Sequence, residues 1–542
     1  MIQQKFQNLD LPQTAFLNAT QFGKFSQLIE DYLLQTNETE HFYALFPNEE
    51  NLVTQTRQKL EKYPNREKVA DIFKAQLSEI DLQSAQVENL EKFTFSNTVT
   101  VTTGHQLNLL TGPLYFFYKI LQTIKCCEEL NTKHQEFNFI PVFWMATEDH
   151  DFAEINHFHY KNHKISWNQS QKGAVGRLEL NEIEKVFDEF EKILPPSTNT
   201  DSLKALIQDS YLSSANLKEA TLKLVQQLFG HYGLLMIDGD DRELKKLMIP
   251  AFEEDLLQHT AYKVVLETNE KLIQKKYNIQ VNPREINLFY LGNGKIRERI
   301  TEENGIFYVV DSEYEFTKDE ILRELKSHPE KFSPNVILRP LYQETILPNI
   351  AYIGGGGEIA YWLQLKDFFQ SQHILFPILI VRNSALLINE KQKSKLEKLE
   401  IEFKNLFQPL YQIVNENIMQ HSQTDIDFGH YESRLRGLFK ELNVKAAETD
   451  VTFSNMVKAQ EKKQLDGLEK MLKRLVKAEK RKQSERVERI ERVYGEIFPN
   501  GNLQERFVNF SQVWMDYGEE FVKEVMDEIH PYDFRFIIKT LP

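Results

Sequence analysis

Cysteine is almost absent from this chain. Its only two cysteines are the neighbours Cys126 and Cys127. Adjacent cysteines rarely form a disulfide with each other, and two thiols alone do not complete a zinc site. The sequence therefore excludes a disulfide framework and favours a reducing compartment such as the cytoplasm.

Long apolar runs and an excess of positive charge are missing as well. No run reaches the roughly 18 apolar residues that a membrane-spanning helix needs, and the first residues lack the apolar region of an export signal. The chain carries 65 basic and 80 acidic side chains, a formal net charge of −15. Because nucleic acids and anionic membranes attract positive fields, we expect a cytoplasmic protein that binds neither.

The pattern that is present indicates an open α/β core. With 542 residues, 41% of them hydrophobic, the chain can fill several domain cores. A β-branched segment, "FTFSNTVTVTTG", is followed by the helical "PLYFFYKILQTIKCCEELN" and the apolar "FNFIPVFWMA". Strand, helix and continuous apolar strand are typical of a parallel sheet covered on both faces. The sheet is predicted to resume at residues 232–241 and 373–383.

The remaining segments divide the chain further. Residues 1–92 are predicted to be mainly helical, the core to span 93–384, and insertions to occupy about 160–230 and 260–335. In the second insertion, Asn293-Gly294 predicts a β-hairpin. Residues 385–500 are predicted to form an antiparallel coiled-coil arm, and residues 501–542 to return to the core.

Two apolar seams underlie the predicted arm. The first runs from Leu396 to Asn417 with 3-4 spacing and should kink at Pro409. The second runs from Leu465 to Ile497 and should pair with the first, with turn residues in "HSQTDIDFGHYESR" between them. Apolar seams of this kind require a partner, so we expect self-association.

A first polar cluster, "TTGHQLNLLTGP" (102–113), connects the first predicted strand to its helix. Backbone N–H groups at such a point can hold a phosphate or carboxylate. The stretch has neither the dinucleotide fingerprint nor the Walker lysine, and the alternative is an ordinary strand-to-helix turn. Its candidate binding residues are Thr103, Gly104, His105, Gln106, Asn108, Thr111 and Gly112.

A second cluster lies in "IPVFWMATEDHDFAEINHFH" (140–159), directly after the apolar strand. Crowded carboxylates raise one another's pKa and imidazoles titrate near neutrality, so the cluster suits a general base or a magnesium site. The spacing of its histidines, which include His157 and His159, matches no standard zinc pattern, and the alternative is a set of caps and surface charges. The catalytic candidates are Glu148, Asp149, His150 and Asp151, with Asp149 and Asp151 as possible magnesium ligands.

A third cluster surrounds four consecutive glycines in "LRPLYQETILPNIAYIGGGGEIAYWLQLK" (338–366). Such a run costs backbone entropy and permits close approach of a ligand ahead of a helix predicted near Glu358. Arginines can hold carboxylates or phosphates through two parallel hydrogen bonds, although a lone arginine is more often a surface residue. The binding candidates are Arg284, Arg297, Arg339, Gln343, Tyr352, Gly354, Gly355, Gly356, Gly357, Glu358 and Tyr361.

The long motifs of this chain resemble those of the BshC family, the cysteine ligases of bacillithiol biosynthesis. The resemblance rests on "TGHQLNLLTGPLYFFYK", "PVFWMATEDHDFAEINH", "VNPREINLFYL" and "SPNVILRPLYQETILPNIAYIGGGGEIAYW", in this order, followed by the coiled-coil tail. It implies a Rossmann-like parallel-sheet core with connecting-peptide-type insertions, and a helical coiled-coil domain through which the chain forms a homodimer.

The implied reaction joins cysteine to glucosaminyl-malate in the last step of bacillithiol biosynthesis. Amide formation from a free carboxylate is uphill in water, so we expect ATP and magnesium to activate the carboxylate of cysteine. Arginines would hold the malyl carboxylates, and Asp149 or Glu358 would orient or deprotonate the glucosamine amine.

Two other functions compete with the ligase. One is a metal-dependent hydrolase or nucleotidyl transferase that uses the acidic cluster after the apolar strand. The other is a non-catalytic assembly protein that binds nucleotide in its core and recruits partners through its coiled coil.

Overall fold

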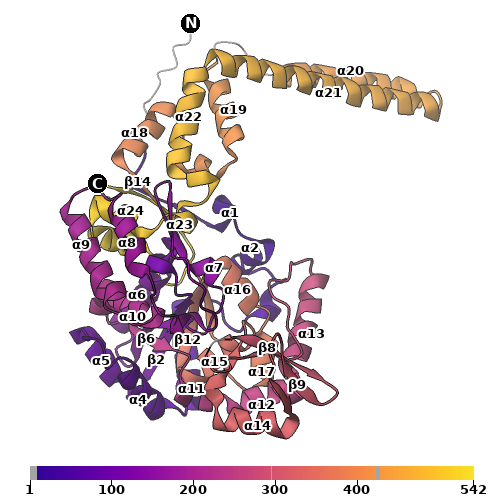
Figure 1. Cartoon of the computed structure of the whole chain (residues 1–542). Coiled ribbons are helices and arrows are strands. Elements are labelled where there is room, and N and C mark those ends of the chain that lie inside the picture. Colours follow the sequence, from indigo (N-terminus) through magenta and orange to yellow (C-terminus); the bar gives the residue numbers. More distant parts are fainter. Residues whose placement is uncertain (1–8, 295, 423–427) are drawn as a thin grey trace. The chain divides into compact units, whose positions relative to one another are not determined.

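The computed structural model describes residues 9–294, 296–422 and 428–542, which form two compact units (Figure 1). The core unit comprises Phe16–Leu386 and Leu503–Lys539. The coiled-coil unit comprises Leu387–Asn502 together with the terminal segments that end at Ala15 and begin at Thr540. Among the described helices, none combines the length and the apolar character that a membrane crossing requires.

A five-stranded sheet forms the centre of the core unit. All its neighbouring strands are parallel, and their order is β13-β12-β2-β3-β6. This is the doubly wound order, in which the direction of winding reverses between β2 and β12. The Rossmann-like fold predicted from the sequence is therefore confirmed. The strands are β2 (Thr98–His105), β3 (Asn138–Met145), β6 (Leu235–Asp238), β12 (Asn349–Gly354) and β13 (Ile378–Val381).

The predicted strand-helix-strand unit is β2, α6 (Tyr115–Lys133) and β3. Its strands are almost wholly buried, as expected for a sheet covered on both faces. Cys126 and Cys127 of α6 are free thiols buried against the apolar side chains of β2, β3, β12 and β13. Both cysteines therefore serve the hydrophobic core.

Strand β12 was not predicted from the sequence. Its polar residue Asn349 is wholly buried, and its Oδ1 accepts hydrogen bonds from Thr100 and Thr102 of β2. It is flanked by α15 (Leu338–Ile346) and α16 (Gly356–Trp362), and α17 (Lys366–Ser371) precedes β13. Helix α16 begins two residues before the predicted start at Glu358.

The N-terminal segment of the core unit is mainly helical, and α3, α4 and α5 pack against the sheet. Lys59 of α3 is buried and donates to the backbone oxygen of Glu344 at 2.8 Å. The elements are β1 (Thr14–Leu17), α1 (Ala19–Phe22), α2 (Gln27–Leu33), α3 (Glu49–Lys62), α4 (Arg66–Gln76) and α5 (Ser84–Phe93).

Two insertions interrupt the sheet. The first contains the hairpin β4 (His157–Tyr160) and β5 (His163–Ser166), with α7 (Phe152–Ile155) before it. The helices α8 (Ile183–Glu191), α9 (Thr198–Ile207) and α10 (Leu217–Phe229) follow it.

The second insertion follows β6 and holds an antiparallel sheet in the order β10-β9-β8-β7-β11. The hairpin predicted at Asn293-Gly294 is present, because β7 and β8 pair antiparallel on either side of it; residue 295 lies outside the described residues. The elements are α11 (Arg242–Lys246), α12 (Ile249–Gln258), α13 (Thr260–Gln274), β7 (Leu288–Tyr290), β8 (Glu298–Glu303), β9 (Ile306–Val309), β10 (Glu315–Thr317), α14 (Lys318–Ser327) and β11 (Phe332–Pro334).

The coiled-coil unit differs from the prediction in two ways. The first seam is not one kinked helix, because α18 (Glu390–Leu399) ends ten residues before Pro409, which caps the start of α19 (Leu410–Gln420). A helix that was not predicted, α20 (Gly429–Ala447), packs against α21 (Val451–Lys482). Both α18 and α19 pack against α22 (Ser484–Ile497). Part of the predicted turn, residues 423–427, lies outside the described residues.

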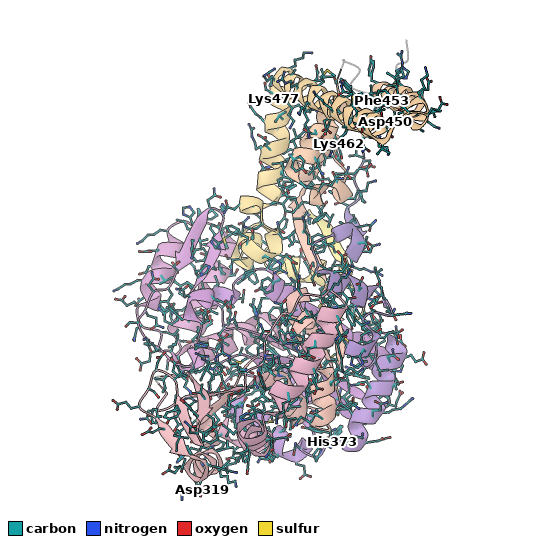
Figure 2. The ribbon with its side chains drawn as sticks, turned by 90° about the vertical axis from the view of Figure 1, so that its right-hand side faces the viewer. Asp319, His373, Asp450, Phe453, Lys462 and Lys477 are labelled. Carbon is teal, nitrogen blue, oxygen red and sulfur yellow. The ribbon has the colours of Figure 1, made fainter. Side chains whose placement is uncertain are left out.

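The hairpin of α20 and α21 has a thin apolar core. Phe439, Ala446 and Val457 are its buried members, with Leu435 packed against them. Most of α21 is polar; Figure 2 marks Phe453, Lys462 and Lys477 along it, with Asp450 as its N-cap.

The chain returns to the core unit at Leu503. There it forms α23 (Gln504–Phe507), α24 (Phe510–Tyr517) and α25 (Glu520–Glu528). The final strand, β15 (Phe536–Leu541), forms a three-stranded sheet with β1 and β14 (Ser384–Asn389), in the order β1-β15-β14.

Candidate functional site

A cavity of about 690 Å³ opens at the carboxyl ends of the parallel strands. Its lining includes Gly104 and His105 from the end of β2, Met145 from β3 and Tyr352 from β12. Ligands of doubly wound sheets bind where the winding reverses, and here that point lies between β2 and β12. The three polar clusters singled out in the sequence meet in this cavity.

A buried ion pair joins the first and third clusters. Lys119 of α6 donates to both carboxylate oxygens of Glu358, at 2.9 and 2.8 Å, and to the backbone oxygen of Gly104. Glu358 also accepts from the hydroxyl of Tyr352 and from the N–H of Gly355, each at 2.9 Å. Burial alone would raise the pKa of Glu358, but the charge and hydrogen bond of Lys119 lower it to about 2. The Glu358 carboxylate is therefore ionised.

Asp149, in the second cluster, is also held as a carboxylate. Its Oδ2 accepts from Gln106 at 2.7 Å, and its Oδ1 accepts from the backbone N–H of His150 at 2.7 Å. Burial opposes ionisation, but the side chain of His150, the hydrogen bond from Gln106, the charge of Arg297 and the backbone N–H of His150 together hold the pKa of Asp149 well below its usual range. A carboxylate so stabilised is a weak base near neutral pH.

His150 and Arg297 are in direct contact at the cavity wall. Arg297 Nη1 lies 2.8 Å from Nδ1 of His150. The guanidinium is buried, and its other nitrogens bond to Ser333 Oγ at 3.2 Å and to the backbone oxygen of Pro334 at 3.1 Å. It also lies 3.9 Å above the ring of Phe289. All three guanidinium nitrogens of Arg297 are therefore bonded to protein atoms.

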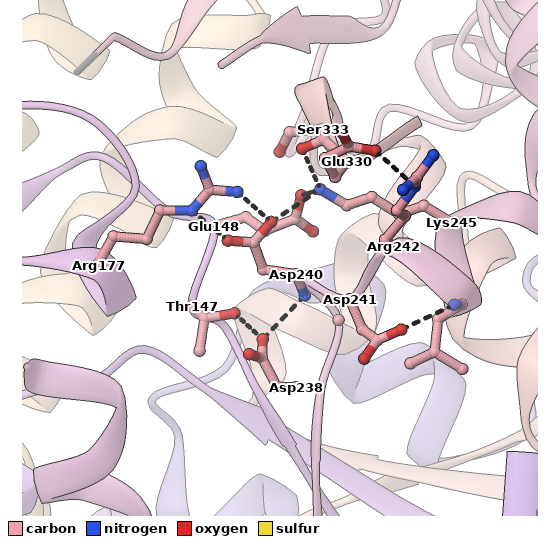
Figure 3. A network of polar contacts seen from close by, with 12 residues as sticks. Thr147, Glu148, Arg177, Asp238, Asp240, Asp241, Arg242, Lys245, Glu330 and Ser333 are labelled. Carbon is pink, nitrogen blue, oxygen red and sulfur yellow. Dashed lines mark hydrogen bonds and ion pairs between the residues drawn. The ribbon is translucent and has the colours of Figure 1, made fainter. Parts of the chain in front are cut away.

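Glu148 belongs to a buried charge network that links β3 to the segment after β6 (Figure 3). Lys245 Nζ lies 2.6 Å from Glu148 Oε1 and 2.9 Å from Asp240 Oδ1. Arg177 binds both oxygens of Asp240, at 2.6 and 2.8 Å. Burial raises the pKa of Glu148 despite the charge of Lys245, while Lys245 and Arg177 overcome the burial of Asp240 and lower its pKa. Of the lining carboxylates, Glu148 is the one with a raised pKa.

A second pair of contacts at the same edge supports this network. Thr147 donates to Asp238 at the end of β6, and the N–H of Asp240 donates to the same oxygen at 2.8 Å (Figure 3). Burial is the main cause that raises the pKa of Asp238. These contacts fix the positions of the strand ends that carry Glu148.

Arg339 lines the cavity without an acidic partner in the described part of the chain. Its donors bond to neutral oxygens, Gln343 Oε1 at 3.1 Å and the hydroxyl of Tyr361 at 3.4 Å. The guanidinium carbon lies 5.7 Å from the ring of Tyr352 and 5.8 Å from that of Trp362. This arrangement leaves a positive charge at the cavity wall, where it can attract an anion.

The C-terminal part of the core unit completes the wall. Arg382, which follows β13, binds both oxygens of Glu505 in α23, at 2.9 and 2.8 Å, and both side chains are buried. The next residue, Arg506, is exposed and lines the cavity. Cavity residues thus come from positions up to 400 apart in the sequence.

His105 is enclosed by aromatic rings, with Tyr115 and Phe116 each at a centroid distance of 5.3 Å. Burial, followed by the charge of Lys119, lowers the pKa of His105 from 6.5 to about 3, so the ring is neutral. Its Nε2 is buried and has no hydrogen-bond partner among the described residues. An unsatisfied buried polar atom is uncommon in a folded protein, and this one belongs to a residue of the cavity lining.

The four glycines have different surroundings. A Cβ at Gly354 would lie 2.9 Å from the ring of Tyr352, and one at Gly356 would lie 2.9 Å from the ring of Phe25. At Gly355 and Gly357 the nearest atoms would be 3.6 and 4.0 Å away, and these two glycines line the cavity. Close packing within the protein therefore explains Gly354 and Gly356, whereas Gly355 and Gly357 face ligand space.

The cavity unites many but not all of the predicted site residues. Those that line it are Gly104, His105, Gln106, Glu148, Asp149, His150, Arg284, Arg297, Arg339, Tyr352, Gly355, Gly357, Glu358 and Tyr361. Those outside its lining are Thr103, Asn108, Thr111, Gly112, Asp151, Gln343, Gly354 and Gly356.

Most of the outlying residues have structural contacts, whereas Asn108 Oδ1 and Thr111 Oγ1 are buried without a hydrogen-bond partner among the described residues. Thr103 bonds to the backbone of β12, and the backbone oxygen of Gly112 accepts from Asn509. Asp151 caps α7 by accepting from the N–H of Glu154. Gln343 supports Arg339, as described above. The β2-to-α6 connection around Asn108 and Thr111 is buried.

Sequence reasoning missed the residues that complete the site from other elements. Lys119, Lys245 and Asp240 neutralise or hold lining groups, and the buried Trp144 of β3 also lines the cavity. The tract "IDGDD" (237–241), at the end of the segment predicted to resume the sheet, was the sequence signal for Asp240.

The donors for a protein-bound metal are not assembled. Among the described residues, no group of three or more His, Cys, Asp or Glu side chains could hold a metal ion. The ring of His159 stacks on that of Phe507, with 4.2 Å between the ring centroids. The ring of His157 lies edge-on to the ring of His159, with 5.5 Å between their centroids. These imidazoles pack with one another and with α23, and they do not share the polar contacts of Glu148, Asp149, His150 and Asp151.

The fold and the cavity define a doubly wound α/β protein with a ligand site at the reversal point of its sheet. The family model of the N-terminal Rossmann-like domain of bacillithiol biosynthesis BshC matches residues 13–383. The model of the C-terminal coiled-coil domain of the same family matches residues 385–541. The chain belongs to the BshC family, and the resemblance seen in its motifs is confirmed.

Relatives match over nearly their whole length. A protein of Flavobacterium psychrophilum is 47% identical, covering 95% of this chain and 97% of the relative. One of Flavobacterium johnsoniae is 47% identical, covering 96% and 98%. One of Christiangramia forsetii is 44% identical, covering 95% and 97%. All three bear the name "Putative cysteine ligase BshC".

Proposed function

We propose that this chain is a ligase that joins the carboxyl group of cysteine to the amine of glucosaminyl-malate. Its membership of a bacillithiol biosynthesis family and the names of its relatives support a cysteine ligase. The observation that carries the proposal furthest is Arg339, a guanidinium in the cavity wall whose bonded oxygens are all neutral. Both proposed substrates carry carboxylates that can form an ion pair with this guanidinium.

The charge balance of the wall supports an anionic ligand. Lys119 neutralises Glu358, Lys245 lies against Glu148, and Glu505 neutralises Arg382. Arg339 forms no ion pair within the described part of the chain, and Arg284 and Arg506 add two exposed guanidinium groups to the lining. Glucosaminyl-malate carries two malyl carboxylates, so it fits a wall with this excess of arginine.

We propose that ATP with magnesium activates the cysteine carboxylate, because amide formation is otherwise uphill. Gly355 and Gly357 leave backbone exposed to the cavity, and His105 offers a free ring nitrogen. Magnesium in such sites binds largely through phosphate oxygens and water, with one or two carboxylates. The absence of a three-ligand cluster among the described residues fits a metal that arrives with the nucleotide.

We assign the proton transfer to Glu148. The attacking amine must lose a proton, and a base works best when its pKa lies near the working pH. Asp149 and Glu358 are held ionised with lowered pKa values, whereas burial raises that of Glu148. Asp149 and Glu358 would then orient the substrates. From the sequence alone, Asp149 or Glu358 was predicted to orient or deprotonate this amine.

The test is a reaction with cysteine, glucosaminyl-malate, ATP and magnesium, each omitted in turn, followed by mass spectrometry of thiol, AMP and ADP. Thiol product that requires ATP supports the ligase; AMP indicates an adenylate and ADP an acyl phosphate. Glu148→Gln should lower kcat by at least about 100-fold, in the range of general-base contributions. If the folded wild-type protein forms no product from authentic substrates, the ligase assignment fails.

We propose further that the chain forms a homodimer through its coiled-coil unit. The hairpin of α20 and α21 exposes large apolar side chains, and its buried core is thin. A second copy would cover such a surface. The exposed members are Tyr431, Leu438, Leu442, Val444, Val451, Phe453, Met456 and Met471.

A further inference from the structure

The contact between Arg297 and His150 determines which ring nitrogen of the histidine carries the proton. A guanidinium has N–H donors and no acceptor, and it stays protonated in proteins. Arg297 Nη1, 2.8 Å from His150 Nδ1, must therefore be the donor. Asp149 Oδ1 also faces Nδ1, but at 3.5 Å it lies farther away than Arg297 Nη1 at 2.8 Å. With Arg297 as the nearer group and a donor only, Nδ1 is the acceptor, and the proton of the neutral ring is on Nε2.

The surroundings make this arrangement rigid. Arg297 is 8% exposed, and Ser333, the backbone of Pro334 and the ring of Phe289 hold its remaining atoms. The guanidinium therefore cannot turn away from His150 without losing three other contacts.

The opposite edge of the imidazole is open. The side chain of His150 is 47% exposed and lines the cavity. Its Nε2 has no protein hydrogen-bond partner among the described residues, whereas its backbone N–H is used by Asp149. The N–H at Nε2 is therefore a hydrogen-bond donor that remains for a ligand.

We propose that Arg297 is a positioning residue that fixes the Nε2–H tautomer of His150, and that His150 donates this N–H to an anionic oxygen of the ligand. The inference deepens the proposed ligase site and rests on it for the identity of the ligand. The acceptor is a carboxylate oxygen of glucosaminyl-malate or a phosphoryl oxygen of ATP. In this role His150 is neither a metal ligand nor the general base.

The tautomer can be measured without catalysis. In protein labelled with ¹⁵N-histidine, the signals of His150 are identified among those of the 14 histidines by their loss in His150→Gln. We expect a protonated Nε2 and an unprotonated Nδ1 near neutral pH. Arg297→Lys, which keeps the charge but not the planar fork, should yield a mixture of tautomers. A protonated Nδ1 in the wild-type protein would overturn the proposal.

Ligand binding tests the donor itself. Calorimetric titrations use ATP with magnesium in one arm and glucosaminyl-malate in the other. His150→Phe, which removes the donor, should weaken one ligand by about 10- to 100-fold, the range of a hydrogen bond to a charged group. His150→Gln retains an N–H donor and should stay within about threefold of wild type. His163→Phe, an exposed histidine outside the cavity lining, is the matched control.

The outcomes separate the hypotheses. Loss confined to ATP identifies a phosphoryl acceptor, and loss confined to glucosaminyl-malate identifies a carboxylate. Unchanged affinity for both ligands in His150→Phe overturns the donor role. If the wild-type protein forms no thiol product while the tautomer and the binding loss are both observed, the ligase assignment fails and the role of Arg297 and His150 stands.

Discussion

His105 should make the stability of the protein sensitive to pH. Its ring is neutral when folded because burial lowers its pKa from 6.5 to about 3. The unfolded chain binds the proton from about pH 6.5 downward. The stability that depends on the neutral ring is therefore complete above pH 6.5 and is lost as the pH falls towards 3.

The matching prediction concerns His105→Gln. Between pH 7 and pH 5 the His105 contribution to the free energy of unfolding should fall by about 2 kcal/mol in the wild-type protein. His105→Gln should lack this part of the decrease. Urea denaturation at both pH values measures the free energy of unfolding. For each protein the value at pH 5 is subtracted from the value at pH 7, and the two differences are compared. Equal pH dependence in the two proteins would contradict a buried neutral imidazole.

The ion pair of Lys119 and Glu358 gives a second prediction. Lys119→Met leaves a carboxylate without its cation, which costs about 3–5 kcal/mol in a fully buried pair. The Glu358 side chain is 31% exposed to the cavity, so water offsets part of the cost and we expect about 2–3 kcal/mol. Urea denaturation provides the value.

The double variant Lys119→Met with Glu358→Gln is the control for that loss. It removes the uncompensated charge, so it should be more stable than Lys119→Met alone. A double variant less stable than the single one would show that Lys119 acts mainly through packing and its bond to the backbone of Gly104.

At individual positions, sequence reasoning located the strand ends well. Gly104 and Asp149 were predicted as site residues because polar groups that follow parallel strands collect at one edge of the sheet. Glu358 was predicted from the run of glycines ahead of its helix. The partners of these groups were not predicted. Lys119 lies within an amphipathic helix pattern, and nothing local distinguishes it from a solvated lysine. Only the assembled fold places its ammonium beside Glu358.

Among the secondary-structure elements, α16 offers a matched pair of substitutions at adjacent glycines. Alanine at Gly356 would put its Cβ 2.9 Å from Phe25, whose ring packs against Phe22 and Phe534 at 5.3 and 4.7 Å. We expect Gly356→Ala to lower the free energy of unfolding by about 1–3 kcal/mol, as overpacking does.

The control is Gly357→Ala, where the nearest atom is 4.0 Å away. Because alanine favours a helix over glycine, this variant should be as stable as the wild type or gain about 0.5–1 kcal/mol. Thermal and urea denaturation of both variants test the pair. Equal destabilisation at the two positions would contradict the packing explanation.

The elements themselves were predictable where their patterns are long. The strand-helix-strand unit of β2, α6 and β3 shows a continuous apolar strand and a long amphipathic helix. Strand β12 was missed because "NIAYIG" is short and runs into four glycines, which favour a loop. Helix α20 was missed because "FGHYESR" begins with turn residues and most of the helix is exposed.

At the scale of the whole molecule, oligomeric state gives a further prediction. Light scattering after size exclusion should give about twice the 63.9 kDa of one chain. Leu438→Glu combined with Met456→Glu should yield the monomer mass, because both side chains are more than half exposed on the hairpin and a charge would oppose burial.

Lys462→Glu in the same hairpin is the control for this change. It alters charge without removing an apolar side chain, and the dimer should persist. A wild-type protein that stays monomeric at all concentrations would contradict the dimer. A dimer that survives the double substitution would place the contact on another surface.

The pairing of Arg382 with Glu505 also has a consequence for the nascent chain. Arg382 belongs to the first segment of the core unit and Glu505 to the second, with residues 387–502 between them. Ribosomes add about 5–20 residues per second, so roughly 6–25 s separate the synthesis of the two partners. During that interval the guanidinium has no counter-ion, and the cavity lacks the wall that Arg506 completes. The cavity wall is therefore complete only near the end of synthesis, after the chain has produced all of its coiled-coil helices.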